Sequence, residues 1–414
     1  MKTGYSHLKC GLIGEKLGHS FSEMIHREIA DYPYELIELS PCEVGDFVKS
    51  RTLDAYNVTV PYKKTVMPFL DYISPEAKAI GAVNTIVCGK NGKLYGYNTD
   101  HFGFSYMLDV SKIEVSGKKV IVFGAGGASA TVCTVLRERG VRELTVIGSK
   151  DNNGSVLKSH YDAEIIINTT PVGMYPKNGY SPVDLSLFPL CEGVLDVIYN
   201  PSKTKLLLDA EKRGLPHING LSMLVAQAVK AFEFFTGDPA DYSICDNIIK
   251  LLEFNTKNII LIGMPGCGKS TVGKTVAEKL SRPFYDADKC FCEFFGKTPA
   301  DVIREDGEEK FRQMEHEIAE QLGKISGAVI ATGGGIVTRS YNYDSLHQNG
   351  TIVFIERKLE NLPTNGRPLS QSNSLESLYN ARIDAYRYFA DVTVSSTEIP
   401  GNTAELIISS IKEI

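Results

Sequence analysis

One glycine-rich segment has the residue types and spacing of a loop that binds phosphate groups. Residues 263–271, Gly-Met-Pro-Gly-Cys-Gly-Lys-Ser-Thr, contain the pattern Gly-x-x-x-x-Gly-Lys-Ser directly after an aliphatic run. In such a loop the backbone N–H groups surround a β-phosphate, the lysine reaches the β and γ oxygens, and the next hydroxyl binds Mg²⁺. The pattern predicts a nucleoside triphosphate site, and its binding residues are Gly266, Cys267, Gly268, Lys269, Ser270 and Thr271.

Two carboxylates follow the next strand signal. Asp286 and Asp288 come at the end of the run Phe284–Asp286, and open α/β sheets bind ligands at the carboxyl ends of their strands. We expect Asp286 to hold the metal together with Ser270, and Asp288 to accept a hydrogen bond from a substrate hydroxyl. An Asp-x-Asp at a strand end is also typical of a helix cap, and this alternative stays open.

A second glycine-rich segment lies far upstream. The run 119–123, Lys-Val-Ile-Val-Phe, leads into Gly124, Ala125, Gly126, Gly127 and Ala128. A buried parallel strand that breaks into glycines and then a helix is typical of a dinucleotide-binding βαβ unit. The segment is a shortened form of that fingerprint, so its interpretation depends on the residues around it.

Composition and charge exclude several classes of protein. The chain has 414 residues, of which 43% are hydrophobic and 23% charged, and a formal net charge of −6. The parts before and after residue 258 are both acidic, so neither has the basic surface that a nucleic acid or an anionic membrane requires. Nine scattered cysteines without a C-x-x-C pair indicate reduced thiols in a cytoplasmic chain. We expect no membrane span and a monomer or homodimer.

The elements that would position these residues fall into two α/β parts. We expect the boundary between them, called the seam below, at 254–257, at the end of an amphipathic helical segment at 246–256. A second helical stretch is expected at 222–235. Before the seam, strands are expected at 10–13, 34–39, 55–60, 85–87, 119–123, 144–147, 165–167 and 193–197. After it, strands are expected at 259–262, 284–286, 329–331, 352–354 and 392–394, which make a doubly wound domain.

The motifs after the seam, taken together, resemble shikimate kinase over essentially all of residues 258–414. They are the phosphate loop, Asp286-Ala-Asp288, Phe311-Arg312-x-x-Glu315, Gly333-Gly334-Gly335, Gly366-Arg367-Pro368-Leu369 and Arg382-x-x-x-Tyr386. The resemblance implies that Asp288 holds ring hydroxyls and that Gly334 offers a backbone N–H. It implies that Arg312 and Arg382 bind the carboxylate of the substrate, since a guanidinium group can donate two parallel hydrogen bonds to a carboxylate. Arg367 would neutralise charge on the transferred phosphoryl group, and Lys269 would share that catalytic role.

The motifs before the seam resemble shikimate dehydrogenase over about the first 250 residues. They include Gly18-His19-Ser20-x-Ser22, Asn57-Val-Thr59-Val-Pro61-Tyr-Lys63, Asn84-Thr85, Asn98-Thr99-Asp100, Asp196-x-x-Tyr199 and Asn219-Gly220-Leu221-x-Met223-x-x-x-Gln227. The resemblance implies a cofactor contact at Gly220 and a substrate site. Its residues would be Ser20, Ser22, Thr59, Asn84, Asp100, Tyr199 and Gln227.

Reduction of a ketone by hydride requires a proton donor at the developing alkoxide. A lysine with a carboxylate nearby is suited to this, so we expect Lys63 to act as acid and base with Asp100 as its partner. The alternative is that Lys63 and Lys64 are a solvated pair and that Asn-Thr-Asp is an ordinary turn.

The chain departs from both families at its nucleotides. The strand that would carry the cofactor's ribose contact ends Ser149-Lys150-Asp151. Ser149 and Lys150 can bind a 2′-phosphate and Asp151 would repel one, so the sequence favours NADP over NAD with weakened binding. The crossover 149–164 is short. In the kinase part, the stretch Arg357–Arg367 is shorter than the family's and contains Leu362-Pro363, which leaves the adenine-side contacts undefined.

The sequence therefore predicts an α/β protein in which a two-lobed dehydrogenase is fused to a P-loop kinase with a five-stranded parallel sheet. The dehydrogenase would have a substrate lobe at 1–100, a Rossmann lobe at 101–220 and closing helices with a linker at 221–257, and the kinase would occupy 258–414. The expected cofactors are NADP(H) and Mg²⁺ with ATP, and the expected substrates are 3-dehydroshikimate and shikimate. Two alternatives remain: a dehydrogenase half that only binds a ligand, and one that also accepts quinate.

Overall fold

The structure is a computed structural model that describes residues 2–18, 20–148, 155–362 and 375–413 of the chain. Two compact units are found. The first contains Met1–Val172, Ser181–Tyr199 and Asp209–Leu251, and the second contains Gly173–Tyr180, Asn200–Leu208 and Leu252–Ile414. The division falls inside helix α9 (Ile244–Thr256).

The first unit begins with a mixed six-stranded sheet in the order β2-β1-β3-β5-β6-β4. Strand β1 pairs in parallel with β2 and β3, while β5 is antiparallel to both β3 and β6. Because β1 and β3 run in parallel, the loops that follow them leave the sheet at one edge. The strands are β1 (Cys10–Gly14), β2 (Tyr34–Glu38), β3 (Ala55–Val58), β4 (Tyr72–Ile73), β5 (Thr85–Cys88) and β6 (Leu94–Tyr97), and the helices are α1 (Ser22–Ile29), α2 (Val44–Ser50) and α3 (Pro75–Ile80).

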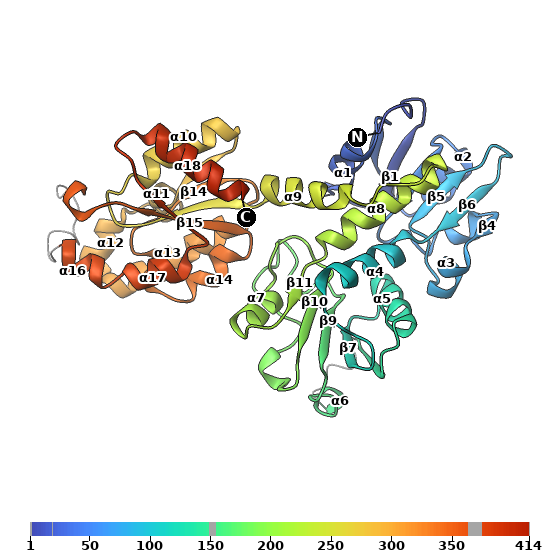
Figure 1. Cartoon of the computed structure of the whole chain (residues 1–414), viewed down its shortest axis with the longest axis horizontal. Helices are drawn as coiled ribbons and strands as arrows, with labels where there is room; N and C mark the ends of the chain where they lie inside the picture. Colours follow the sequence, from blue (N-terminus) through green and yellow to red (C-terminus); the bar gives the residue numbers. More distant parts are fainter. Residues whose placement is uncertain (1, 19, 149–154, 363–374, 414) are drawn as a thin grey trace. The chain divides into compact units, whose positions relative to one another are not determined.

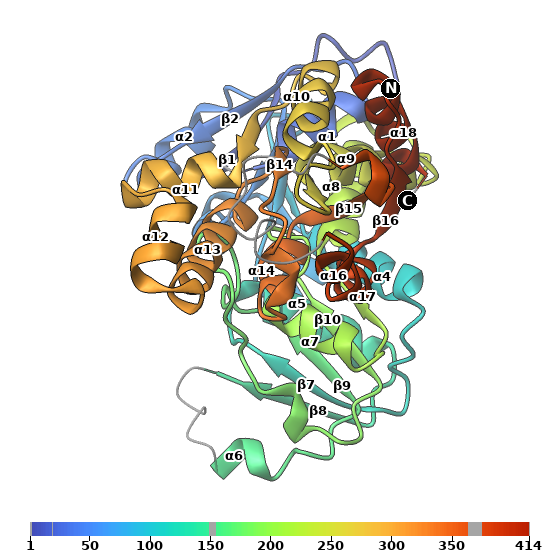
Figure 2. The ribbon, with the colours of Figure 1, turned by 90° about the vertical axis from the view of Figure 1, so that its left-hand side faces the viewer.

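The same unit contains a five-stranded parallel sheet in the order β11-β10-β9-β7-β8; β7, β8, β9 and β10 are labelled in Figure 2. Helices α4 (Thr99–Ser111) and α8 (Leu221–Thr236) pack against each other (Figure 1). Strand β7 is buried throughout, as its aliphatic run predicts. The elements are β7 (Lys119–Phe123), α5 (Gly127–Glu138), β8 (Glu143–Ile147), α6 (Ser155–Lys158), β9 (Ile165–Asn168), β10 (Gly193–Asp196), β11 (His217–Ile218) and α7 (Lys205–Lys212), which is divided between the two units after Leu208.

The second unit is built on a parallel sheet in the order β13-β14-β12-β15-β16. Helices α10 and α18 lie on one face of this sheet, and α13, α14 and α17 lie on the other (Figures 1 and 2). The strands are β12 (Asn258–Ile262), β13 (Phe284–Asp286), β14 (Val329–Ala331), β15 (Gly350–Glu356) and β16 (Val392–Ser395). The helices are α10 (Lys269–Leu280), α11 (Ala287–Phe295), α12 (Pro299–Asp306), α13 (Glu308–Gly323), α14 (Asn342–His347), α16 (Leu375–Asn380), α17 (Ile383–Phe389) and α18 (Pro400–Lys412).

The expected fold class is confirmed, with differences at strand ends and with the short strands β4, β6 and β11, which were not expected. The strand expected at 55–60 ends at Val58, and the following segment turns through Pro61, which has no N–H to donate to a ladder. Strand β6 was not expected because Gly96 interrupts its short Leu-Tyr-Gly-Tyr run. In the described ranges, no helix has both the length and the apolar character that crossing a membrane requires.

Candidate active sites

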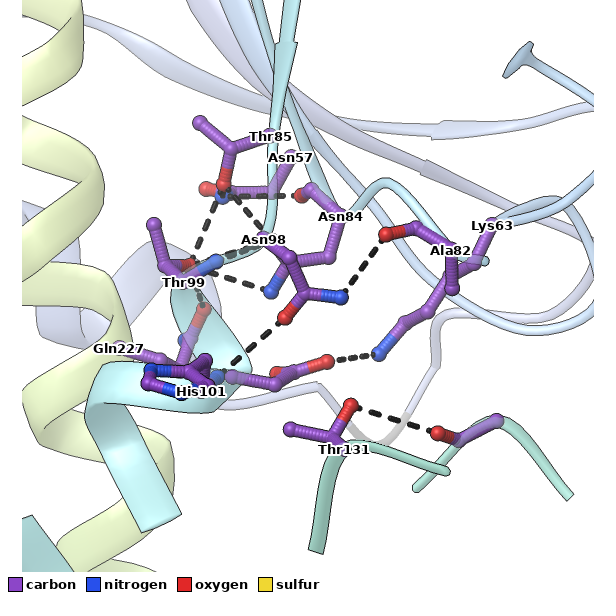
Figure 3. Close-up of polar contacts among 12 residues, drawn as sticks. Asn57, Lys63, Ala82, Asn84, Thr85, Asn98, Thr99, His101, Thr131 and Gln227 are labelled. Carbon is purple, nitrogen blue, oxygen red and sulfur yellow. Dashed lines mark hydrogen bonds and ion pairs between the residues drawn. The ribbon is translucent and has the colours of Figure 1, made fainter. Parts of the chain in front are cut away.

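Lys63 and Asp100 form an ion pair in the first unit. Lys63 lies in the loop after β3, and Asp100 lies in the first turn of α4; the Lys63 Nζ is 2.6 Å from the Asp100 Oδ2. Asn98 caps α4 by accepting a hydrogen bond from the N–H of His101 at 3.3 Å, and its Nδ2 donates to the carbonyl of Ala82 at 2.9 Å (Figure 3). This cap fixes the first turn of the helix and thereby the Asp100 carboxylate.

A buried polar network lies behind this pair (Figure 3). The N–H of Thr99 donates to the Oδ1 of Asn84 at 2.7 Å, and the Asn84 Nδ2 donates to the Thr99 Oγ1 at 3.1 Å. The Thr99 hydroxyl also lies 3.2 Å from the Oε1 of Gln227 on α8. Asn57 joins the network by donating to the Thr85 Oγ1 at 3.1 Å. Because buried polar groups that have partners hold one another in place, this network orients the amides of Asn84 and Gln227.

Residues 20–22, the serine loop, lie after β1 and lead into the first turn of α1. Ser22 begins α1, and its N–H donates to the Ser20 Oγ at 3.2 Å. The ring of Phe21 lies 5.3 Å from that of Tyr199, which brings Tyr199 to the serine loop. Burial raises the pKa of the Tyr199 phenol, so the hydroxyl stays neutral and able to donate a hydrogen bond.

Thr59 approaches the end of β1 from β3. A Cβ at Gly14 would lie only 2.6 Å from the Cγ2 of Thr59, so the Thr59 side chain lies close against the end of β1. The side chains that the sequence assigns to one substrate site come from the segments after β1 and β3, from helices α4 and α8, from Asn84 directly before β5 and from Tyr199 after β10.

The glycine segment after β7 leaves its backbone uncovered. Gly124 has a φ of +109°, and a Cβ there would lie 2.5 Å from the Thr169 Oγ1. Gly126 and Gly127 have nothing within 4 Å of a Cβ position, and α5 begins at Gly127. Helix α5 has twelve residues, and its uncovered N-terminus fits the pyrophosphate of a dinucleotide. Ser149 and Lys150, which the sequence assigns to a 2′-phosphate, lie outside the described residues.

Gly220 has a packing role. A Cβ at this position would lie 2.0 Å from the Val197 carbonyl oxygen, so only glycine lets α8 start against the end of β10.

The phosphate loop of the second unit connects β12 to α10. The Lys269 Nζ donates to the carbonyls of Gly263 at 2.9 Å and Met264 at 3.1 Å, which holds the ammonium across the loop. The Ser270 hydroxyl donates to the Asp286 Oδ2 at 2.6 Å. The other Asp286 oxygen accepts from the N–H of Asp288 at 3.2 Å and caps α11. Asp286 therefore serves as a helix cap and also faces the hydroxyl to which the sequence assigns the metal.

Arg312, Asp288, Gly334 and Arg382 line one cavity of about 500 Å³ with the phosphate loop. Arg312 is only 2% exposed and donates to Glu315 at 2.8 Å and to Glu308 at 2.9 Å. The Arg382 Nη1 donates to the Gly334 carbonyl at 3.1 Å, and the Tyr386 hydroxyl donates to the same oxygen. These two donors fix the Gly334 carbonyl, and the whole glycine turn, residues 333–335, lines the cavity. Arg367 lies outside the described residues.

Glu315 is the buried acid of this cavity. Burial raises the pKa of its carboxyl group, while the adjacent Arg312 acts in the opposite direction. A Cβ at Gly333 would lie 2.8 Å from the Glu315 Oε1, and a Cβ at Gly335 would lie 2.2 Å from the Arg312 Nη1. The glycine turn is therefore shaped by the Arg312–Glu315 pair.

Several residues of the two candidate sites were not among the site residues predicted from the sequence. Glu315 was visible as the last position of the Phe-Arg-x-x-Glu motif, and its spacing of three from Arg312 on a helix could have paired them. Asn57 and Thr99 also stood within quoted motifs. Their partners lie up to 128 residues away in the sequence, so no spacing signal connected them.

Comparison with family models matches three segments of the chain. Residues 12–86 match the shikimate dehydrogenase substrate binding domain, residues 220–247 match the shikimate 5′-dehydrogenase C-terminal domain, and residues 265–412 match shikimate kinase.

Relatives and solved structures agree with the first two matches. A shikimate dehydrogenase (NADP(+)) of Clostridium perfringens is 40% identical over 267 residues, which cover 59% of this chain and 97% of the relative. The crystal structure of shikimate dehydrogenase 1 from Peptoclostridium difficile has a TM-score of 0.54 at 38% identity and covers 61% of this chain and 98% of its own. That of the Thermus thermophilus enzyme in complex with NADP(H) and shikimate has a TM-score of 0.54 at 30% identity, covering 59% and 99%. The chain therefore belongs to the shikimate dehydrogenase family and carries a shikimate kinase domain after its dehydrogenase part, so that it combines both enzymes in one polypeptide.

Proposed function

We propose that this protein carries out two consecutive reactions, the NADPH-dependent reduction of 3-dehydroshikimate to shikimate and the phosphorylation of the shikimate 3-hydroxyl by ATP. The product of the first site is the substrate of the second. Because both domains belong to one chain, the two enzymes are present in equal amounts. The observation that carries the first reaction is the Lys63–Asp100 pair, 2.6 Å apart and backed by the buried Thr99 network. NADP(H) is the cofactor named for the Clostridium perfringens relative.

In the dehydrogenase site, Lys63 would donate a proton to the oxygen of the ketone as the carbonyl carbon accepts hydride. Asp100 would keep the ammonium oriented toward that oxygen. Asn84 and Gln227 would bind ring hydroxyls or the carboxylate, and Ser20 and Ser22 would bind the carboxylate end. NADPH, for which the uncovered turn at 124–128 has room, supplies the hydride.

In the kinase site, Arg312 and Arg382 would hold the substrate carboxylate and Asp288 its ring hydroxyls, and the N–H groups of the glycine turn would face the ring. Lys269 and the loop amides would bind the nucleotide phosphates, with Ser270 and Asp286 on the metal side. ATP with Mg²⁺ supplies the phosphoryl group, and catalysis depends mainly on positioning and electrostatics. We assign the substrate lobe to 1–100, the Rossmann lobe to 101–220, the closing helices to 221–257 and the kinase to 258–414.

Separate assays of the purified protein test this proposal. We expect shikimate oxidation with NADP⁺ to exceed that with NAD⁺ and with quinate as substrate, and shikimate phosphorylation to require ATP and Mg²⁺. Lys63→Ala should abolish only the first activity and Lys269→Ala only the second. If the wild-type protein phosphorylates shikimate but oxidises neither shikimate nor quinate, the dehydrogenase half is a ligand-binding module. Faster turnover with quinate would instead assign the first half to that substrate.

A further inference from the structure

Arg357 stands out among the charged residues of the kinase cavity. It follows β15 directly, is half-buried, and lines the cavity together with Pro265 and Gly266 of the phosphate loop. Within the described parts of the chain, no hydrogen bond, ion pair or ring contact engages its side chain. A half-buried guanidinium group without an anionic partner loses hydration without compensation, which favours an anion brought by a ligand.

The other cations of the cavity already have partners in the protein. Arg312 is paired with Glu315 and Glu308. Lys269 donates to two loop carbonyls, and Arg382 donates to the Gly334 carbonyl. Among the described cations that line the cavity, Arg357 is therefore the one that can bind a ligand without first breaking a contact within the protein.

The order of the sheet indicates which ligand Arg357 faces. Asp288 follows β13 and the glycine turn 333–335 follows β14, both on one side of the central strand β12. Arg357 follows β15, on the opposite side of β12. The phosphate loop, which follows β12, thus separates Arg357 from these acceptor-side residues.

The end of β15 is also in contact with the start of the phosphate loop. Ile262 pairs with Phe354 in the parallel register, and a Cβ at Gly263 would lie 2.6 Å from the Ile355 carbonyl oxygen. Arg357 is two residues beyond that contact. The backbone of Arg357 therefore lies close to the loop whose N–H groups are arranged for phosphate, and Arg357 lines the same cavity as that loop.

From this placement we propose that Arg357 binds the phosphate chain of the nucleotide from the β15 side. A guanidinium group donates several hydrogen bonds to phosphate oxygens in a fixed geometry, which lysine does not. This inference rests on the proposed kinase function, and it adds a nucleotide-binding residue outside the phosphate loop.

Equilibrium binding of ADP with Mg²⁺ to the full chain tests the proposal without requiring turnover. Arg357→Ala should weaken ADP binding about 10- to 100-fold, the range for a lost charge-assisted hydrogen bond. Adenosine, which has no phosphate, should bind to the variant and the wild type equally. Arg357→Lys should recover part of the affinity. Lys358→Ala, which removes the same charge one residue along the chain from an 81% exposed side chain, should bind ADP like the wild type.

Several outcomes would overturn the inference. The first is an affinity of Arg357→Ala for ADP that is within twofold of the wild type. The second is an equal loss of affinity for adenosine, which would indicate a contact to the base. The third is a loss of affinity for shikimate alone. Circular dichroism and unchanged shikimate oxidation confirm that each variant is folded. If the wild type fails to phosphorylate shikimate while ADP binding still depends on Arg357, the proposed function fails and this inference stands.

Discussion

The Lys63 ammonium group lies 2.6 Å from the Asp100 carboxylate, although the two residues are 37 positions apart and come from a loop and a helix. Both side chains are more than three-quarters buried, at 23% and 13% exposed. The pair is thus sheltered enough to hold its geometry and open enough to meet a substrate.

Replacing Lys63 by alanine should lower kcat for shikimate oxidation by about 10²- to 10⁴-fold, the usual contribution of general acid–base catalysis. The matched control is Lys64→Ala, since Lys64 is the next residue and is exposed. Steady-state rates with NADP⁺ measure the effect, and shikimate phosphorylation should not change. Equal losses for the Lys63 and Lys64 variants would mean that the two lysines act only as surface charge.

Thr99 should control the binding of the substrate more than the chemical step. Thr99→Val keeps the shape of the side chain but removes the oxygen that accepts from Asn84 and lies near Gln227. Both amides would lose orientation, so we expect the KM for shikimate in the oxidation reaction to rise about tenfold, for a lost contact of about 1.4 kcal/mol. Thr99→Ser retains the hydroxyl and should restore the KM. An unchanged KM in Thr99→Val would exclude this positioning role.

The Lys63–Asp100 pair could be predicted from the sequence, whereas the positioning role of Thr99 could not. Lys63 and Asp100 each belong to a short motif, so their residue types and the reaction's need for a proton donor already suggested the pair. Thr99 is adjacent to Asp100 but acts through Gln227, 128 residues away, and only the packing of α4 against α8 brings them together.

The same distinction holds in the kinase. The strand runs and the phosphate loop follow from local patterns, because a buried parallel strand and a phosphate loop each require particular residues at fixed spacing. The pairs of Arg312 with Glu308 and Glu315 also follow from local helical spacing. That Arg357 has no partner among the described residues depends instead on which side chains the fold brings to the end of β15. No local pattern in the sequence contains that information.

Asp286→Asn should weaken the binding of Mg²⁺ by the kinase without unfolding it. Asparagine caps helices as well as aspartate, so α11 keeps its first turn. The carboxylate that accepts from Ser270 loses its charge, and we expect the half-saturating Mg²⁺ concentration for shikimate phosphorylation to rise about 10- to 100-fold. Glu278→Gln, which neutralises an exposed carboxylate on α10, is the control. A Mg²⁺ dependence identical to wild type would show that Asp286 serves only as a cap.

His26 should make the stability of the dehydrogenase unit dependent on pH. Its ring is fully buried, stacked 3.9 Å from Tyr34, and its Nδ1 lies 2.7 Å from the Tyr32 hydroxyl. Burial lowers the pKa of His26 from 6.5 to about 3, against a smaller opposite effect of Asn57. The folded state therefore takes up its proton less readily than the unfolded state, and the stability that neutral His26 contributes is full above pH 6.5 and lost as the pH falls toward 3.

Between pH 7.5 and 5.5 this loss should reach about 1.4 kcal/mol in the free energy of unfolding. His26→Phe keeps a ring against Tyr34 and Phe235 but cannot titrate, so its free energy of unfolding should lack this part of the pH dependence. Urea unfolding followed by circular dichroism measures both proteins, and the transition of this unit is the one that NADPH shifts. If the two proteins lose the same free energy over this range, His26 is not the group that titrates on unfolding.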